Sequence, residues 1–392
     1  MKILLVTDYA TPTGGMEMLL LRLRDALRKH GHDARLFASS AKPLDVANQA
    51  DYECLGTTSR WRTLLQTANP WAWMKLHRVL DDFKPDLVHL GVFLTQLSPL
   101  ILTPLRKIPT LHHVGWYRAV CPVGTKTLPD GTECRSPAGV VCYRNRCLPL
   151  RDWVPLMIQT YLWRRWRSTC DVHVAVSNAT RHRLLGEGFA PVELIPNGVS
   201  VTPCPLPLHP SPTVTFAGRL VEQKGADILL RAFATVVAQI PEARLIIAGT
   251  GPEETRLSRM VSALGLSSSV TLLGHLSAPE MEKHLAGAWV HVVPSRWAEA
   301  FGLTAVEAMM RGTAVVASRC DGLAEIVRDG VTGYLVPPGN PEALAGALCR
   351  LLGDRTLAET MGTAARGIAI ERYSEEHWVT RLLGLYRTLL HA

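Results

Sequence analysis

The sequence predicts an α/β protein made of two domains, each with a parallel β-sheet covered by helices on both faces. A chain of 392 residues is longer than a single hydrophobic core usually supports. Short apolar runs alternate with longer amphipathic stretches, and this alternation of strands and helices is typical of parallel sheets. The expected strand–helix pairs are residues 3–7 with 18–29, residues 245–248 with 253–264, and residues 313–317 with 324–327.

A proline-rich segment marks the boundary between the two domains. Residues 202–212 contain five prolines, and proline is disfavoured in helix interiors and in central strands. We therefore expect a first domain over residues 1–203, a linker over residues 204–212 and a second domain over residues 213–373.

The composition, with 47% hydrophobic and 19% charged residues, is that of an ordinary soluble globular protein. No apolar run approaches the roughly 20 residues needed to span a bilayer. The apolar start over residues 1–6 is too short for a signal peptide. We expect a cytoplasmic protein whose contact with the inner face of a membrane, if it has one, is peripheral.

The most informative stretch joins an expected strand over residues 289–294 to an expected helix over residues 303–310 through Gly302. A helix start after such a turn presents unpaired backbone N–H groups and a positive dipole end, which favour a phosphate. Glu299 and Glu307 flank this turn, and a carboxylate suits the hydroxyl groups of a sugar or ribose. Solvated glutamates are the more common arrangement in general, but this combination indicates a clamp for a sugar nucleotide.

A second motif places two cations after another expected strand, residues 214–220. Arg219, which follows Gly218, and Lys224 flank a tight loop that opens an amphipathic stretch over residues 226–237. Arginine binds a diphosphate as a fork and lysine as a point charge. Basic loop residues are usually solvated, so it is the presence of both motifs that favours a diphosphate site.

Together the two motifs resemble the signatures of the family-4 glycosyltransferases, which are retaining enzymes of the GT-B fold. The resemblance covers nearly the whole chain in the family's order. Gly14 and Gly15 follow the first expected strand, where the family has a glycine loop near the donor's phosphates. Residues 86–90 resemble the family's strand into the cleft, and residues 195–199 resemble the close of its first domain.

Two positions depart from the family's pattern. His112 ends a strand that carries a His-Asp pair in the family, but the second position is His113 here. Asp321 and Gly322 stand where two glycines are usual, so only the first glycine is lost. The segment from His112 to Cys121 is also longer than in the common pattern.

The resemblance implies two Rossmann-like domains facing across a cleft, with residues 374–392 crossing back to complete the first domain. It implies transfer of a sugar from a UDP- or GDP-linked donor without a catalytic metal ion or other required cofactor. Arg219 and Lys224 would stabilise the leaving diphosphate, Glu299 would contact the transferred sugar, and His112 would position a sugar hydroxyl. The implied donor-binding residues are Gly14, Gly15, Gly218, Arg219, Lys224, Gly274, His275, Leu276, Glu299, Phe301, Gly302, Leu303, Thr304 and Glu307.

Positive charge is concentrated in the expected first domain. Residues 1–205 hold 25 Lys or Arg against 16 Asp or Glu, whereas the remainder holds 17 against 18. Residues 135–167 contain seven arginines and one acid, interleaved with Trp153, Tyr161, Trp163 and Trp166. This mixture suits an anionic membrane surface or a lipid-linked acceptor, and the alternative is a core helix with solvated arginines. No nucleic-acid recognition motif accompanies the basic pI.

Four of the nine cysteines, Cys121, Cys134, Cys142 and Cys147, fall in an insert over about residues 115–150 that is rich in Gly, Pro and Arg. Their spacing lacks the paired knuckles typical of zinc sites. A structural zinc site made of these thiolates, free thiols and a disulfide all remain open, and a disulfide is the least expected in a cytoplasm.

Three functions compete for this sequence. The first is an active retaining transferase that acts on a glycan, a glycolipid or a polysaccharide or natural-product intermediate. The second is a degenerate binding module that holds a sugar nucleotide and serves as a pathway partner. The third is a nucleotide-sugar epimerase of the same fold, whose acid–base carboxylates are not apparent. The joint presence of Arg219, Lys224, Glu299 and Glu307 favours the transferase.

Overall fold

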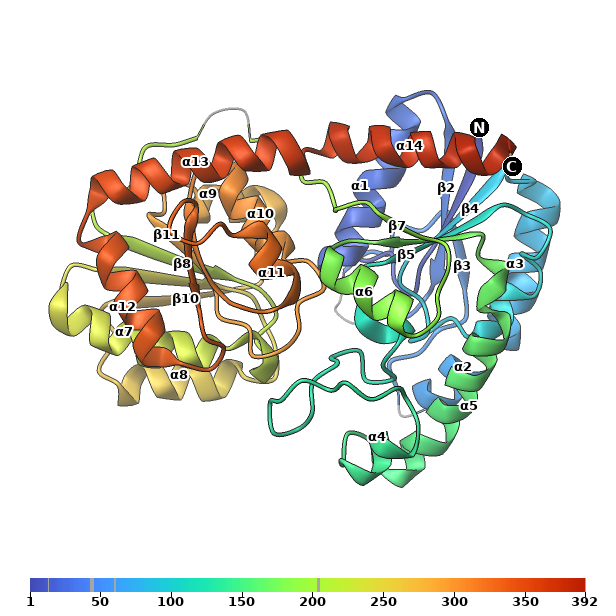
Figure 1. Cartoon of the computed structure of the whole chain (residues 1–392), viewed down its shortest axis with the longest axis horizontal. Coiled ribbons are helices and arrows are strands. Elements are labelled where there is room, and N and C mark those ends of the chain that lie inside the picture. Colours follow the sequence, from blue (N-terminus) through green and yellow to red (C-terminus); the bar gives the residue numbers. More distant parts are fainter. Residues whose placement is uncertain (13, 43–45, 60, 203–204, 392) are drawn as a thin grey trace. The chain divides into compact units, whose positions relative to one another are not determined.

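The computed structural model describes residues 1–12, 14–42, 46–59, 61–202 and 205–391, and these form two compact units. Unit 1 comprises Met1–Asn197 and Trp378–Ala392, and unit 2 comprises Gly198–His377 (Figure 1). Each unit contains one fully parallel sheet with helices on both faces. The predicted α/β class with two parallel sheets is therefore confirmed.

The unit boundaries differ from the predicted ones. Residues 198–202, assigned to the first domain, belong to unit 2, because Val199 N donates a hydrogen bond to Tyr373 O at 2.8 Å. The predicted boundary residues 203 and 204 lie outside the described residues. The rest of the predicted linker also belongs to unit 2, where Trp289 Nε1 donates to His209 O at 2.8 Å. The part of the proline-rich segment over residues 205–212 is thus packed onto unit 2 and is not a free spacer.

The sheet of unit 1 has seven strands in the order β3-β2-β1-β4-β5-β6-β7. The strands are β1 (Lys2–Val6), β2 (Asp33–Ser39), β3 (Tyr52–Cys54), β4 (Leu87–Leu90), β5 (Thr110–Val114), β6 (Val172–Ala175) and β7 (Val192–Leu194). The helices are α1 (Gly15–Lys29), α2 (Arg62–Thr67), α3 (Pro70–Phe83), η1 (Pro99–Leu102), η2 (Tyr117–Ala119), α4 (Val140–Arg144), α5 (Leu150–Trp166), η3 (Arg167–Thr169) and α6 (Asn178–Gly186), together with α14 (Glu375–His391), which belongs to unit 1 from Trp378 onward.

The sheet of unit 2 has six strands in the order β10-β9-β8-β11-β12-β13. The strands are β8 (Thr213–Ala217), β9 (Arg244–Ala248), β10 (Val270–Gly274), β11 (Val290–Val293), β12 (Ala314–Ser318) and β13 (Gly333–Val336). The helices are η4 (Glu222–Lys224), α7 (Ala226–Gln239), α8 (Glu254–Ala263), α9 (Ala278–Leu285), α10 (Leu303–Met310), α11 (Asp321–Ile326), α12 (Pro341–Leu352) and α13 (Arg355–Tyr373). The predicted helix over residues 303–310 matches α10.

Each sheet contains a switch point, where the chain reverses its direction of travel across the sheet. In unit 1 the chain runs outward from β1 to β3 and then returns to place β4 on the other side of β1. In unit 2 it runs from β8 to β10 and returns to place β11 beside β8. The loops after the two strands at each switch point, β1 and β4 in unit 1 and β8 and β11 in unit 2, then leave toward opposite faces of the sheet. Ligands of such sheets bind between these two loops.

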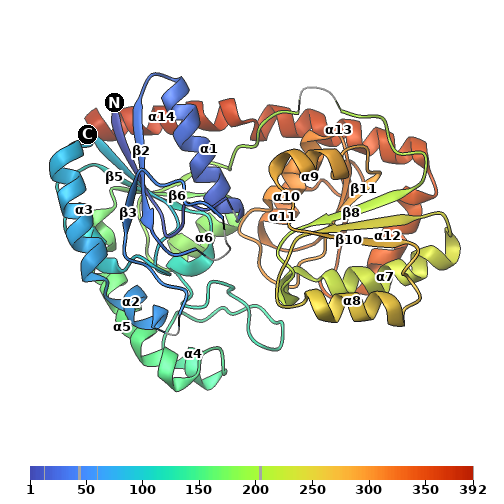
Figure 2. The same cartoon turned by 180° about the vertical axis from the view of Figure 1, so that it is seen from behind.

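The helices of unit 2 follow from this path. Helices α7, α8 and α12 lie on one face of the sheet, and α9, α10 and α13 lie on the other (Figures 1 and 2). Phe216 on β8 and Val292 on β11 pack in one apolar cluster with residues of α7 and α12, and Ala217 on β8 packs with Leu285 of α9 in another. The core therefore holds the strand ends that carry the polar loops in fixed positions.

Unit 1 contains a chain of buried, hydrogen-bonded rings. Tyr386 Oη lies 2.6 Å from His89 Nδ1, and His89 Nε2 lies 3.2 Å from His113 Nδ1. His113 Nε2 then lies 2.9 Å from Asn197 Oδ1. One proton order satisfies every group: each ring is neutral, donates through Nε2 and accepts through Nδ1, and the tyrosine hydroxyl starts the chain. His113 is thus a core group of unit 1, at the position where the resembled family has Asp.

Two buried histidines, His113 in this ring chain and His173 on β6, predict that unit 1 loses stability in acid. Burial lowers the pKa of His113 to about 4 and that of His173 to about 4, below the ordinary value near 6.5. The unfolded chain binds protons first as the pH falls, so stability is complete above about pH 6.5 and is lost toward about pH 4. We expect the free energy of unfolding to fall by on the order of 3 kcal/mol for each of these histidines.

Urea unfolding followed at a series of pH values measures this loss. Replacement of His113 by Gln should flatten the pH profile, whereas replacement of the exposed His182 by Gln should leave it unchanged. If the unfolding free energy of the wild type does not change between neutral pH and about pH 4, the histidines are not held neutral by burial.

Candidate functional site

The loops that follow β8 and β11 meet at the switch point of unit 2. Arg296 N donates to Gln223 O at 2.8 Å, and the Arg296 guanidinium pairs with Asp227. Gly225 adopts φ 69°, and a Cβ atom there would lie 2.0 Å from Pro294 O. Only glycine therefore allows the loop after β8 to approach the end of β11 this closely.

Lys224 and Glu299 come together where these loops meet. Lys224 Nζ lies 2.6 Å from Glu299 Oε1, and it also lies 5.4 Å from the centre of the Trp297 ring. Ser295 Oγ and Trp297 Nε1 donate to the same oxygen at 2.6 Å and 2.9 Å. Among the described residues Glu299 Oε2 has no hydrogen-bond partner, so one carboxylate oxygen remains available to a ligand.

The environment keeps Glu299 ionised. Burial alone would raise the pKa of this carboxyl group, but the charge of Lys224 and the three hydrogen bonds outweigh it and lower the pKa. Since an ionised carboxylate only accepts hydrogen bonds, Oε2 suits a ligand hydroxyl. Lys224, predicted as a diphosphate ligand, is partly compensated by its ion pair with Glu299.

Arg219 differs from Lys224 in this respect. It follows Gly218 directly after β8, its side chain is exposed, and it makes no side-chain hydrogen bond or ion pair within the described ranges. A guanidinium in this position is free to bind a phosphate as a fork. It is therefore the uncompensated cation of the two.

The start of α10, four residues after Glu299, adds backbone hydrogen-bond donors to the site. Gly302 precedes the helix with φ 122°, and the first amide groups of α10, those of Leu303 and Thr304, have no intrahelical acceptor. Glu307 lies one turn further along the helix and is half-buried. Phe301 is buried and packs edge-on against Tyr373, so only its backbone remains for a ligand.

The loop between β12 and α11 closes the back of this site. Gly322 N donates to Glu299 O at 2.9 Å, and a Cβ atom on Gly322 would lie 2.6 Å from Phe301 O, so the second position of the motif requires glycine. The first position, Asp321, has φ 31°, a left-handed conformation that Asp tolerates better than most residues. The departure from two glycines is therefore accommodated by the backbone.

The segment from Gly274 to Leu276 lies at the end of the edge strand β10. Gly249 N donates to Gly274 O at 2.7 Å, and a Cβ atom on Gly249 would lie 1.8 Å from Gly218 O. The ends of β8, β9 and β10 thus lie close together. Leu276 packs into a small apolar cluster and His275 is exposed, which leaves the backbone of this segment as the part with defined polar groups.

The remaining predicted residues lie in unit 1. Gly14 and Gly15 form the start of α1, and a Cβ atom on Gly115 would lie 2.2 Å from Met16 Sδ, so the loop after β5 lies against this helix start. His112 lines a pocket at the ends of β4 and β5.

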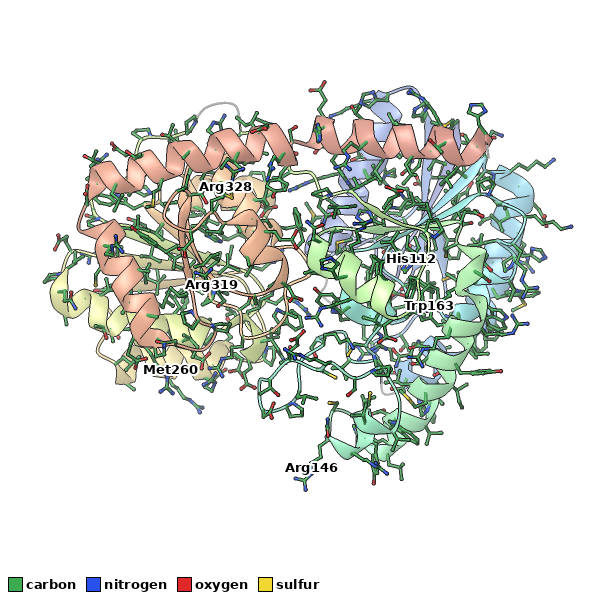
Figure 3. All side chains as sticks on the ribbon, in the orientation of Figure 1. His112, Arg146, Trp163, Met260, Arg319 and Arg328 are labelled. Atoms are coloured by element: carbon green, nitrogen blue, oxygen red, sulfur yellow. The ribbon has the colours of Figure 1, made fainter. Side chains whose placement is uncertain are left out.

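The ring of His112 is held by aromatic neighbours. His112 Nδ1 lies 3.1 Å from His173 Nδ1, and the ring centre lies 5.2 Å from that of Trp163 and 5.4 Å from that of Phe93 (Figure 3). Burial, and then His173, lower the pKa of His112 well below 6.5, so the imidazole is neutral. Nε2 has no partner among the described residues and is the atom that remains for a ligand hydroxyl.

Several residues that shape these sites are not part of the predicted motifs. Ser295 and Trp297 converge on Glu299, and Arg296 joins the two loops of unit 2. Their closeness to Glu299 in the sequence indicates that they belong to the same loop. The direction of their side chains depends on how that loop folds back. Arg118, which lines the pocket of unit 1, carried no motif signal.

The four cysteines of the insert are free thiols. In the described part of the chain, no group of three or more His, Cys, Asp or Glu side chains is arranged to hold a metal ion. The structural zinc site, one of the predicted alternatives, is not tested by this arrangement and stays a prediction. Burial, followed by the neighbouring thiols, raises the pKa of Cys147, so the thiol form is favoured.

Known proteins resemble both halves of the chain. The family model described as Glycosyl transferases group 1 matches residues 206–368, and the model described as Glycosyltransferase Family 4 matches residues 13–202. The chain is 36% identical over 234 residues to a phosphatidyl-myo-inositol mannosyltransferase of Mycobacterium leprae, an alignment that covers 58% of this chain and 61% of the relative. It is 33% identical over 250 residues to a GDP-mannose-dependent alpha-(1-6)-phosphatidylinositol monomannoside mannosyltransferase of Mycolicibacterium smegmatis, covering 58% and 64%. The chain thus spans less than two thirds of these relatives' lengths.

Solved structures match the whole chain. Sucrose-phosphate synthase from Thermosynechococcus elongatus aligns with a TM-score of 0.76 at 24% identity, covering 100% of this chain and 99% of the other. Anabaena HepE in complex with UDP and glucose aligns with a TM-score of 0.72 at 20% identity, covering 99% and 100%. These neighbours confirm the predicted GT-B fold class.

The Lys224–Glu299 pair yields a stability prediction. Replacement of Lys224 by Met leaves Glu299 buried without its cation, and loss of one partner of a buried pair costs about 3–5 kcal/mol. Burial then raises the pKa of Glu299, so the deficit should be largest at neutral pH and should shrink as the pH falls and the carboxyl group takes up a proton. Differential scanning calorimetry across this pH range measures the effect.

The double variant with Lys224→Met and Glu299→Gln is the matched control. Because it removes the charge along with its partner, it should recover most of the lost stability. Equal losses in the single and the double variant would show that the two side chains are not coupled.

Proposed function

Because the chain belongs to the family-4 glycosyltransferases of group 1, we propose that it transfers a sugar from a nucleoside-diphosphate sugar to a hydroxyl group of an acceptor, with retention of configuration. The observation that carries the proposal is the arrangement at the switch point of unit 2. The loop after β8 carries Arg219, which makes no side-chain hydrogen bond or ion pair among the described residues. The loop after β11 carries the buried, ionised Glu299, with one available oxygen, and leads into the start of α10. These groups match a sugar hydroxyl and a diphosphate.

In this proposal unit 2 binds the donor. Arg219 and the amide groups of Leu303 and Thr304 bind the diphosphate, and Glu307 accepts hydroxyl groups of the ribose. The backbone of residues 274–276 reads the base. Support for a UDP- or GDP-linked donor comes from a structural neighbour bound to UDP and from a relative named as GDP-mannose-dependent.

The chemistry follows from the charge that develops at the donor. As the bond to the sugar breaks, negative charge builds on the leaving diphosphate oxygen, and Arg219, Lys224 and the α10 amides stabilise it. Because these donors are positioned before the reaction, no metal ion is required in the scheme. Glu299 Oε2 orients a hydroxyl group of the transferred sugar, and His112 Nε2 is the hydrogen-bond acceptor that unit 1 offers to a ligand hydroxyl. The acceptor oxygen bonds to the anomeric carbon on the face from which the diphosphate departs, and the departing phosphate oxygen takes the acceptor's proton.

A binding module without catalysis is the second candidate. It draws support from the two departures from the family pattern, His113 and Asp321. Both have structural reasons: His113 belongs to the buried ring chain of unit 1, and Asp321 takes a left-handed conformation beside an obligatory Gly322. Neither departure removes a group that the proposed reaction uses, so we favour the transferase.

A thermal-shift panel of UDP, GDP, ADP and their sugar conjugates, without and then with Mg²⁺, tests the proposal. Millimolar ligand at a micromolar site stabilises by roughly 4 kcal/mol, so one nucleotide should stand out without metal. Replacement of Glu307 by Ala should weaken donor binding by about tenfold or more, since a charged hydrogen bond is lost. Replacement of Arg219 by Ala should lower turnover by about a hundredfold and affect binding less.

The variant with Glu342→Ala, which removes an exposed glutamate at the start of α12, is the matched control and should bind like the wild type. No shift with any nucleotide would transfer support to a module that binds another class of ligand. Wild-type turnover in both site variants would refute the proposed roles.

We further propose that unit 1 contacts an anionic membrane through α5. Leu150, Val154, Ile158 and Tyr161 recur at helical spacing and are exposed, Tyr161 by 67%. Helix α2, which is tied to α5 by a hydrogen bond of 3.1 Å from Thr67 Oγ1 to Pro155 O, adds further exposed apolar side chains, Trp61 and Leu64. None of the helices in the described part of the chain combines the length and apolar character needed to span a bilayer.

The basic and aromatic residues of this region divide into two groups. Trp163 is buried, and Trp153 Nε1 donates to Gly139 O at 3.0 Å, so these rings anchor the helix inward. Arg167 is likewise structural, because it binds the Glu187 carbonyl oxygen at 2.8 Å. Arg144, Arg146 and Arg165 are exposed, and Arg146 extends away from the body of unit 1 (Figure 3). These are the arginines that suit anionic headgroups.

Replacement of Arg144, Arg146 and Arg165 by Glu should weaken binding to anionic vesicles by about a hundredfold, since each basic residue near such a surface contributes about 1 kcal/mol. Vesicle co-sedimentation measures this loss. The control reverses three exposed cations of unit 2, Arg231, Arg259 and Lys283, and should bind as the wild type does. If the wild-type protein does not co-sediment with anionic vesicles, the proposed membrane contact through α5 is wrong.

A further inference from the structure

Arg118 lies where two neighbouring pockets of unit 1 meet. It belongs to η2, which follows β5 through Gly115 and Trp116. One pocket, at the ends of β4 and β5, is lined by Gly91, His112 and Arg118 among others. The adjoining pocket is lined by Arg118, Gln159, Thr160 and Trp163 among others. Arg118 is therefore the cation common to both cavities.

The guanidinium of Arg118 has only neutral partners. Nη2 donates to Gln66 Oε1 at 3.0 Å and to Leu94 O at 3.2 Å. Nε is buried and makes no hydrogen bond, and within the described ranges no carboxylate forms an ion pair with this side chain. Nη1 is also unpaired there and is not fully buried, so it is the donor that a ligand can reach. A largely buried charge without a counter-ion is costly and uncommon in a protein interior.

Among the described residues, no carboxylate pairs directly with this guanidinium. The acid that acts most on Arg118 is Asp8, which accepts from the backbone N–H groups of Thr95, Gln96 and Leu97 at 2.7–2.8 Å and from the Thr95 hydroxyl at 2.6 Å. Its two oxygens are occupied by the loop after β4.

The other charged and titratable groups acting on Arg118 do not supply the missing anion either. Arg62 has the same sign as Arg118, and Tyr9 and Cys121 are weak acids. Burial lowers the pKa of Arg118 to about 10, so the guanidinium remains charged at neutral pH.

We propose that Arg118 binds an oxyanion, a phosphate or a carboxylate, carried by the acceptor substrate in the pocket at the ends of β4 and β5. This inference rests on the proposed transferase function, in which unit 1 receives the acceptor. A guanidinium matches the geometry of either oxyanion. His112 lines the same pocket, so the anion binds close to a neutral ring whose Nε2 has no partner among the described residues. The acceptor class is therefore an anionic one.

Thermal shifts with small probes test this inference. Inorganic phosphate and glucuronate supply the two oxyanions, and glucose is the neutral counterpart of glucuronate. Wild-type protein should be stabilised by at least one anion and not by glucose, and added salt should reduce the shift because it screens the charge. A preference for phosphate or for glucuronate identifies the oxyanion. No shift with either anion overturns the inference.

Replacement of Arg118 by Met separates ligand binding from a structural role. In anion-free buffer the melting temperature of the variant should equal or exceed that of the wild type, because a buried charge without a counter-ion is removed. Its anion response should be absent. If the variant does not fold, Arg118→Lys decides: it keeps the charge but loses the fork, and should bind the anion about tenfold more weakly. An unchanged anion response in either variant refutes the proposal.

Two further comparisons keep this inference distinct from the donor site. The variant with Arg219→Ala should retain the anion response, because its cation lies in unit 2, and the variant with Arg62→Met should also retain it. Arg118→Met should keep the full stabilisation by the preferred nucleotide. A wild type that responds to anions but to no nucleotide would count against the donor site alone, whereas a response to nucleotides without one to anions would count against Arg118 alone.

Discussion

The ion pair between Lys224 and Glu299 joins the two loops on which the candidate donor site of unit 2 is built. One partner follows β8 and the other follows β11, and these strands flank the switch point of the sheet. A buried carboxylate is stable there only because the ammonium group and two further donors converge on one of its oxygens. The glycines around the pair permit this approach: Gly225 lets one loop reach β11, and Gly322 lets the next loop lie behind Glu299.

The two units treat buried charge in opposite ways. In unit 2 the charge of Glu299 is compensated within the protein, and what remains for a ligand is a single oxygen of defined direction. In unit 1 Arg118 forms no ion pair with a carboxylate among the described residues, and it borders two pockets whose linings include His112 and Arg164. The first arrangement favours recognition of neutral hydroxyl groups, and the second favours an anion. In the proposed function, this contrast separates the donor chemistry of unit 2 from the acceptor chemistry of unit 1.

The sequence predicted the features that are encoded locally. Strands, helices and the polar residues that follow each strand depend on short-range patterns, so α10 and the positions of Arg219, Lys224 and Glu299 at strand ends were predictable. The convergence of Ser295 and Trp297 on one oxygen was not, since it depends on how a loop folds back. The role of His113 required contacts with β4 and with Tyr386, which lies far along the chain. Arg118 carries no sequence signal because its significance is the lack of an anionic partner among the described residues, which no motif encodes.

The path of α14 has a consequence for how the protein is made. Unit 1 is completed by residues from Trp378 onward, and Tyr386 closes its buried ring chain through His89. A ribosome delivers these residues only after all of unit 2 has emerged. Domains generally fold as they are synthesised. Here the sheet of unit 1 is synthesised first, and the surface that α14 covers stays exposed until α14 has been synthesised. During translation the nascent first half is therefore the part most exposed to aggregation, and the part for which a chaperone has the most to cover.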